Sequence, residues 1–130
     1  MEMFSGLIGG FATGAHIHCC APIGTNAGVA VPFTGFPNVA AGSYMNTFDL
    51  TLTSTYNSTF LTASGGTAAA AETALINGLN SFQAYANIHD ATFPGGEIRG
   101  LRLLYIPPRI SSLRGGHVTV AYCDETSPAK

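Results

Sequence analysis

Apolar and polar residues alternate over several short stretches of this chain, a pattern typical of half-buried β-strands. The stretches are residues 13–19, 29–33, 47–53 and 82–90. The clearest is 47–53, where Phe48, Leu50 and Leu52 share one face. The stretch 29–33 contains Pro32, which cannot donate a ladder hydrogen bond, so it predicts an edge strand. The pattern therefore predicts a β-rich domain.

One segment departs from this period and favours a helix. After Gly65-Gly66, Thr67 can cap a run of alanines that favours helix, and Gly78 marks its end. The sequence therefore predicts one short crossover helix at about residues 67–78, packed on the sheet.

A tight turn follows the last of the alternating stretches. Phe93-Pro-Gly-Gly96 predicts a turn, because glycine tolerates positive φ, and a returning strand begins at about residue 97. Gly95, Gly96, Glu97 and Arg99 are thus expected to form a structural hairpin. Glu97 and Arg99 lie on one face, where a structural ion pair closing the hairpin is expected.

Composition limits the class of protein. The chain has 130 residues, of which 46% are hydrophobic and 9% are charged, with a net charge of −2. This length fits one domain with a modest core. There is no basic field for nucleic acid, no apolar run long enough to cross a membrane, and no composition typical of disorder.

Three histidines carry the chemistry that the pattern suggests. His16 and His18 point to the same side of one strand, and His89 lies on the other histidine-bearing strand with Tyr85 and Asn87 as polar neighbours. Three imidazoles that converge suit zinc or copper. The alternative is a polar patch in which the rings donate hydrogen bonds to backbone carbonyls or to Asn87. No Ser-His-Asp or Cys-His catalytic constellation stands out, so no catalytic residue is assigned.

The three cysteines leave the disulfide pattern open. Cys19 and Cys20 are adjacent, and a bond between neighbours needs an unusual geometry. A disulfide from Cys19 or Cys20 to Cys123 is sterically ordinary and requires an oxidising compartment. Cys20 is also a candidate thiolate ligand beside the histidines.

Two blocks of sequence resemble the CHRD (chordin) domain family. The first runs from Phe4-Ser-Gly-Leu7 to Thr13-Gly-Ala-His-Ile-His18. The second and more specific block is Tyr85-Ala-Asn-Ile-His89 followed by Phe93-Pro-Gly-Gly-Glu-Ile-Arg-Gly100. The resemblance covers roughly residues 4–104 and implies an all-β fold, an immunoglobulin-like, Greek-key β-sandwich or barrel. The cysteine pair after His18 is similar to bacterial single-domain members.

The resemblance also implies where the domain lies and how the chain is divided. It suggests a CHRD-like β domain at residues 4–106 and a divergent tail at 107–130, with one added strand starting at His117. Family members usually begin with further strands, so the chain resembles a member that lacks its N-terminal strands. An extracellular or cell-envelope location is implied, although residues 1–7 show no secretory signal.

Two functions from different classes follow. The first is a non-enzymatic binding or adhesion domain with an unidentified protein or surface ligand. The second is a copper- or zinc-binding metalloprotein that uses His16, His18 and His89, with redox activity as an option.

Overall fold

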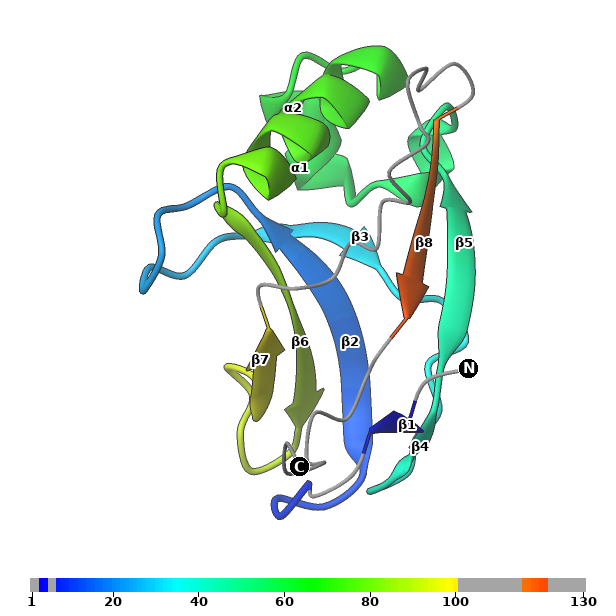
Figure 1. Ribbon diagram of the computed structural model, residues 1–130, viewed down its shortest axis with the longest axis vertical. Coiled ribbons are helices and arrows are strands. Elements are labelled where there is room, and N and C mark those ends of the chain that lie inside the picture. The colour runs from blue at the N-terminus through cyan, green and yellow to red at the C-terminus, as the bar shows by residue number, and fades with distance from the viewer. Residues whose placement is uncertain (1–2, 5–6, 101–115, 122–130) are drawn as a thin grey trace, which may run out of the picture.

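The computed structural model describes residues 3–4, 7–100 and 116–121, and this part of the chain is mostly β-strand (Figure 1). The strands are β1 Met3–Phe4, β2 Ala12–Cys19, β3 Val29–Pro32, β4 Gly42–Ser43, β5 Met45–Asp49, β6 Ala84–Asp90, β7 Ile98–Gly100 and β8 His117–Ala121. The helices are η1 Thr53–Thr55, α1 Ser58–Ala63 and α2 Ala68–Asn80. The β-rich prediction is therefore confirmed.

The strands form antiparallel sheets. The largest has the order β3-β2-β6-β7, and β1 pairs with β4 and β5 with β8. β3 is an edge strand, as Pro32 predicts, because no described strand pairs with its outer side and needs the missing N–H. β2 and β6 are central, and every pair in this sheet is antiparallel.

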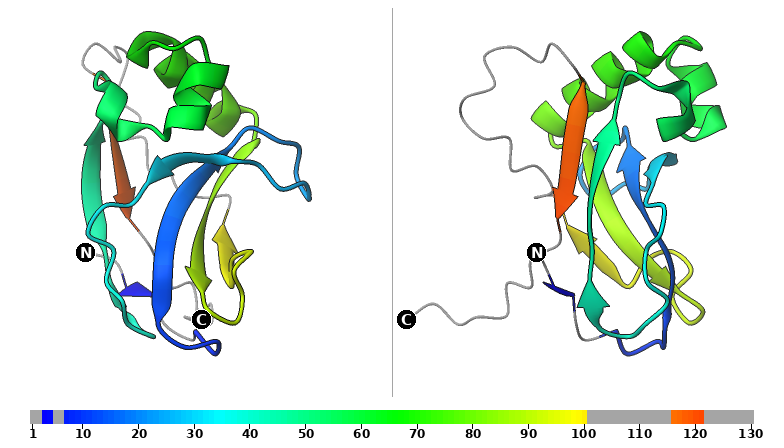
Figure 2. Two further views of the ribbon diagram at one scale, coloured as in Figure 1. Left: turned by 180° about the vertical axis from the view of Figure 1, so that it is seen from behind. Right: turned by 90° about the vertical axis from the view of Figure 1, so that its right-hand side faces the viewer.

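The pair β5–β8 lies on the core side of the large sheet, and the helices cover one end of the strands (Figure 2). β8 begins at His117, where an added strand is expected. The rest of the tail lies outside the described residues.

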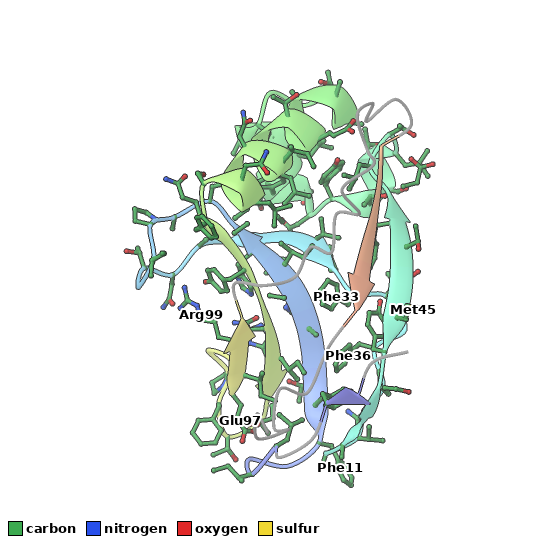
Figure 3. All side chains as sticks on the ribbon, in the orientation of Figure 1. Phe11, Phe33, Phe36, Met45, Glu97 and Arg99 are labelled. Carbon is green, nitrogen blue, oxygen red and sulfur yellow. A yellow bond between two sulfur atoms is a disulfide. The ribbon has the colours of Figure 1, made fainter. Side chains whose placement is uncertain are left out.

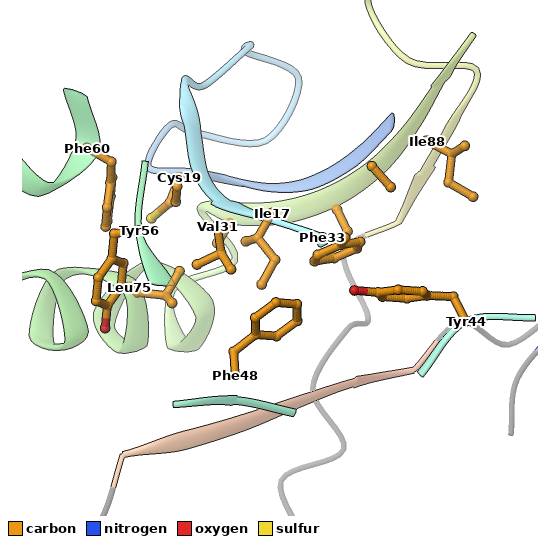
Figure 4. Packing of buried hydrophobic residues seen from close by; sticks show 14 of the residues in the cluster. Ile17, Cys19, Val31, Phe33, Tyr44, Phe48, Tyr56, Phe60, Leu75 and Ile88 are labelled. Atoms are coloured by element: carbon orange, nitrogen blue, oxygen red, sulfur yellow. The ribbon is translucent and has the colours of Figure 1, made fainter. Parts of the chain in front are cut away.

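The core is a cluster of apolar side chains between these layers (Figure 4). Ile17, Val31 and Ile88 supply aliphatic contacts from the large sheet and are each at most 1% exposed. Phe33, the residue directly after β3, stacks against Phe48 of β5, with 5.7 Å between ring centroids. Burial of this cluster is the main force that holds the sheets together.

The strand predicted at residues 47–53 ends early. In the structure β5 stops at Asp49, whose Oδ1 accepts hydrogen bonds from the N–H and the hydroxyl of Thr51. Phe48 and Leu50 are buried as expected, but Leu52 is 51% exposed. The expected shared face of three apolar residues is therefore wrong at its last member, because the aspartate turns the chain.

Helix α2 begins as predicted and ends later. The Thr67 hydroxyl accepts a hydrogen bond from the N–H of Ala70, which satisfies a donor of the first turn. Gly78 does not end the helix, which continues to Asn80. Termination occurs at Phe82, where φ is +58° and the N–H groups of Phe82 and Gln83 bond back into the last turn. The shorter helix α1 has no counterpart in the sequence prediction.

Within the part of the chain that the structure covers, neither helix has the length and apolar character needed to cross a membrane.

Candidate metal centre

The register between β2 and β6 brings the three predicted histidines together. In one unbroken register, His18 lies opposite Tyr85, His16 opposite Asn87 and Gly14 opposite His89, and the bulge in β2 lies outside this stretch. The missing side chain of Gly14 leaves room above the strand, and the ring of His16 lies over this glycine. Ile17, which lies between the two histidines of β2, points into the core, so the cluster occupies the outer face of the sheet.

The rings are close enough to share one ligand. The centroids of His16 and His89 are 4.9 Å apart, and those of His18 and His89 are 5.5 Å apart. One nitrogen from each of the three rings can be chosen so that all lie within 4.8 Å of one another. His18 is 7% exposed, and the other two rings are half-buried.

Hydrogen bonds to the backbone determine which nitrogens carry protons. His18 Nδ1 lies 2.9 Å from the carbonyl oxygen of Ala27, and His89 Nδ1 lies 2.8 Å from that of Pro94. A carbonyl oxygen only accepts, so both Nδ1 atoms are donors. The Nε2 atoms of these two rings then face each other at 3.4 Å with their lone pairs. A metal-binding histidine commonly donates its other ring N–H in this way.

The surroundings disfavour protons in the cluster. Burial, together with the charges of His89 and His18, lowers the pKa of His16 to about 4. Burial also lowers the pKa of His18, against the opposing effect of the Ala27 carbonyl. His16 Nδ1 is itself buried without a hydrogen-bond partner among the described residues. At neutral pH His16 and His18 are therefore neutral imidazoles, each with a lone pair.

Tyr85 and Asn87 hold the neighbourhood of the cluster in place. The Tyr85 ring stacks on His18, with 5.0 Å between centroids, and its hydroxyl accepts a hydrogen bond from the N–H of Ala27. Asn87 is 2% exposed and donates from Nδ2 to the carbonyl of Gly95. Its Oδ1 is buried without a partner in the described part of the chain.

The hairpin forms as a turn, but its charged residues bind elsewhere. The N–H of Gly96 donates to the carbonyl of Phe93, and a Cβ at Gly96 would collide with Asn87. Glu97 accepts hydrogen bonds from the N–H groups of Ile8 and Gly9. Arg99 instead lies over the Tyr85 ring. The two side chains therefore hold neighbouring loops, in place of the ion pair that their shared face suggests.

The structure joins Cys19 to Cys20 by a disulfide. Both sulfurs lie against helix α2, within 4.0 Å of the Ala74 carbonyl oxygen. Neither cysteine therefore pairs with Cys123, which lies outside the described residues, and Cys20 offers no thiolate to the histidines.

Sequence reasoning misses the residues that orient the rings. The carbonyls of Ala27 and Pro94 belong to loops, and backbone oxygens leave no mark in a sequence pattern. The packing of Tyr85 between His18 and Arg99 likewise depends on how the loop of residues 21–28 folds back over the sheet. Pro94 carries the one available signal, because it belongs to the predicted turn.

Comparison with known proteins agrees with the sequence motifs. The model of the CHRD domain matches residues 3–101, which is most of the chain and includes all three histidines of the cluster. Neither the curated proteins nor the solved structures contain a match. The chain therefore belongs to the CHRD domain family.

Proposed function

We propose that this CHRD domain is a metal-binding module in which His16, His18 and His89 hold one transition-metal ion. The family itself indicates a non-enzymatic binding domain. The observation that carries the metal proposal is the pair of Nε2 atoms of His18 and His89, which face each other at 3.4 Å. Because both Nδ1 protons are used by carbonyl oxygens, two lone pairs meet there. A cation between them removes that repulsion.

The spacing of the nitrogens supports zinc or copper as the ion. Two nitrogens bound at about 2.0–2.1 Å in a tetrahedral site lie about 3.3 Å apart. The separation of the Nε2 atoms of His18 and His89 is 3.4 Å. The wider limit of 4.8 Å for the whole set means that a ring must move inward by up to about 1.5 Å to complete the site. An all-imidazole site suits zinc and copper, and three protein ligands leave a position for a fourth.

Titration of the full-length protein with metal tests this proposal. The protein is stripped with chelator and titrated calorimetrically with Zn²⁺ and Cu²⁺, with Mg²⁺ as a hard-ion control. We expect one Zn²⁺ or Cu²⁺ per chain and no binding of Mg²⁺. The double variant His16→Ala/His18→Ala is expected to bind at least about 100-fold more weakly, since it lacks two ligands.

The fourth histidine supplies a matched control. His117 lies on β8, which pairs with β5 and not with the histidine-bearing strands. His117→Ala is therefore expected to bind metal as the natural chain does. Circular dichroism of each variant verifies the fold. A folded double variant that binds as tightly as the natural chain, or a natural chain without stoichiometric binding, would contradict the proposal.

The second candidate function is a metal-free binding or adhesion domain. It is favoured by the carbonyl bonds of His18 and His89, which organise a polar patch without any ion. In that case chelator and added zinc leave the unfolding midpoint unchanged. Bound metal, in contrast, raises it in proportion to the logarithm of the free metal concentration.

We also propose an immunoglobulin-like sandwich for the fold and an extracellular or cell-envelope location. The sandwich is supported by the aromatic contact of Phe33 with Phe48, which joins the large sheet to the β5–β8 pair. The location is supported by the family, which is of an extracellular type, and by the Cys19–Cys20 disulfide, since disulfides persist in oxidising compartments.

A further inference from the structure

A small cavity lies beside the histidine cluster, on the other side of Tyr85. Its volume is about 250 Å³, and it is lined by residues 21–24 of the loop after β2 together with Phe82, Tyr85 and Arg99. The loop is fixed to the segment between α2 and β6 by the hydrogen bond from the N–H of Ala21 to the carbonyl of Gln83. The walls of the cavity are therefore held by backbone contacts.

Phe82 is an unusual residue for its position in this wall. It lies at the C-terminal stop of α2 with φ +58°, in the left-handed region where glycine is normal and a bulky residue is strained. The N–H of Phe82 bonds to the carbonyl of Leu79, and the next N–H bonds to Gly78. Glycine would make the same backbone bonds without strain, so helix termination does not explain the phenyl ring.

The apolar side chains at the cavity are exposed. Phe82 is 61% exposed, and Ile23, across the cavity in the loop, is 69% exposed. Two large apolar side chains that line one cavity and remain exposed to water are typical of a ligand site.

Arg99 gives the cavity a positive charge. It is the only lysine or arginine in the described part of the chain. Figure 3 labels Arg99 beside the blue loop that follows β2. Its guanidinium carbon lies 3.6 Å from the centre of the Tyr85 ring, and its nitrogens donate to Asn26 Oδ1 and to the carbonyl of Thr25. Both acceptors are neutral, so they orient the guanidinium without cancelling its charge. A planar guanidinium held in this way matches a carboxylate.

We propose that this cavity binds a carboxylate that carries one apolar group about the size of a phenyl ring. The carboxylate pairs with Arg99, and the apolar group packs between Phe82 and Ile23. The volume is slightly below the roughly 300 Å³ at which small-molecule sites begin, which limits the ligand to one ring. The proposal does not depend on metal at the histidine cluster.

A nuclear magnetic resonance titration of the ¹⁵N-labelled full chain tests the proposal. The probe is 3-phenylpropionate, with 3-phenylpropan-1-ol as the neutral analogue and acetate as the charge without the ring. We expect saturable shifts at the amides of Ile23, Gly24 and Gln83, with a dissociation constant in the millimolar range for so small a ligand. The alcohol is expected to bind about tenfold more weakly, because it lacks the charge-assisted pair.

Two variants separate binding from folding. Phe82→Gly removes the ring and the backbone strain together, so we expect weaker binding by about tenfold with an unchanged or higher unfolding midpoint. Arg99→Gln is expected to bind the acid and the alcohol equally. Phe11→Ala removes another exposed ring, 65% exposed and not part of the cavity, and is expected to bind as the natural chain does.

The source of the carboxylate is distinguished by a further pair of probes, N-acetyl-Gly-Phe with a free carboxylate and its amide. Tighter binding of the free-acid dipeptide than of 3-phenylpropionate assigns the site to a chain terminus, and the reverse order assigns it to a small acid. Either order supports the proposal. It is overturned if no probe gives saturable shifts up to about 20 mM, if the alcohol and the acid bind equally to the natural chain, or if Phe82→Gly binds unchanged.

Discussion

His16 differs from the other two histidines of the cluster in its hydrogen bonding. Its Nδ1 is buried and has no partner among the described residues, whereas His18 and His89 each donate to a carbonyl. Its pKa is lowered to about 4, first by burial and then by the charges of the neighbouring rings. A neutral imidazole in this state can bind a cation through a ring nitrogen. It also makes the stability of the fold sensitive to acid.

The stability of the metal-free protein is therefore expected to fall as the pH is lowered from about 6.5 to about 4. In this window the unfolded chain protonates His16 while the folded chain does not, so protons favour unfolding. Because the ring is half-buried, the slope from His16 stays well below the limit of about 1.4 kcal/mol per pH unit for one proton. Urea unfolding at several pH values measures it.

His16→Gln is expected to flatten the part of this slope that belongs to His16. The carboxyl group of Asp90 does not interfere with this comparison of the two pH slopes. Burial raises the pKa of that carboxyl, but the hydrogen bonds that its Oδ1 accepts from the N–H groups of Phe93 and Thr92 favour the ionised form, and the pKa lies below its ordinary value. An identical slope in His16→Gln and the natural chain would show that the pKa of His16 does not differ between the folded and the unfolded chain.

At the scale of elements, helix α2 is fitted to the end of strand β2 by a glycine. Gly78 is buried inside the helix, and a Cβ there would collide with the sulfur atoms of both Cys19 and Cys20. Glycine lowers the stability of a helix interior. Its presence where the helix faces the disulfide therefore indicates close packing between the two. The strand that bears His16 and His18 is thus anchored to the helix at its last residue.

Gly78→Ala is therefore expected to destabilise the protein, even though alanine favours helix. Crowding in a packed interior costs about 1–3 kcal/mol, which exceeds the gain of about 1 kcal/mol in helix propensity. Thr73→Ala in the same helix is a matched control, because Thr73 is exposed and its hydroxyl donates to the Ala69 carbonyl of the same helix. Alanine there removes that exposed bond and improves helix propensity. Denaturant unfolding measures both, and equal or higher stability of Gly78→Ala would contradict the close packing.

At the scale of the whole molecule, the sheet is completed by residues beyond the family match. The match ends at residue 101, but β5 pairs along its length with β8, at residues 117–121. The backbone N–H of Leu50 also donates to the carbonyl of Gly116. The layer opposite the large sheet therefore depends on a segment that the family pattern does not contain.

Removal of β8 is expected to weaken the whole fold. A chain that ends at residue 115 leaves the backbone groups of β5 without this partner and uncovers part of the core near Phe48. A chain that ends at residue 121 keeps the strand, so the difference between the two isolates its contribution. We expect a lower midpoint and a broader thermal transition for the shorter chain by differential scanning calorimetry. Coincident transitions would show that β5 is stable alone.

Much of the fold follows from local patterns. The period of two identifies β2, β3 and β6, the threonine at position 67 begins the helix, and the turn at residues 93–96 forms as predicted. Local patterns fail where a distant contact decides. Glycine is typical of a helix end, yet α2 continues past Gly78, because this glycine packs against the sulfur atoms of the disulfide. Phenylalanine is not typical of a helix end, yet α2 ends two residues before Phe82, which takes a positive φ.

For the candidate site too, some features follow from the sequence and others only from the tertiary structure. The sequence by itself determines that His16 and His18 share a face, and that His89 shares one with Tyr85 and Asn87, because strand side chains alternate whatever the rest of the chain does. The tertiary structure alone decides that these faces meet, through the regular β2–β6 register. It also decides which nitrogens point inward, because the carbonyls that accept the Nδ1 protons belong to loops closed by distant contacts.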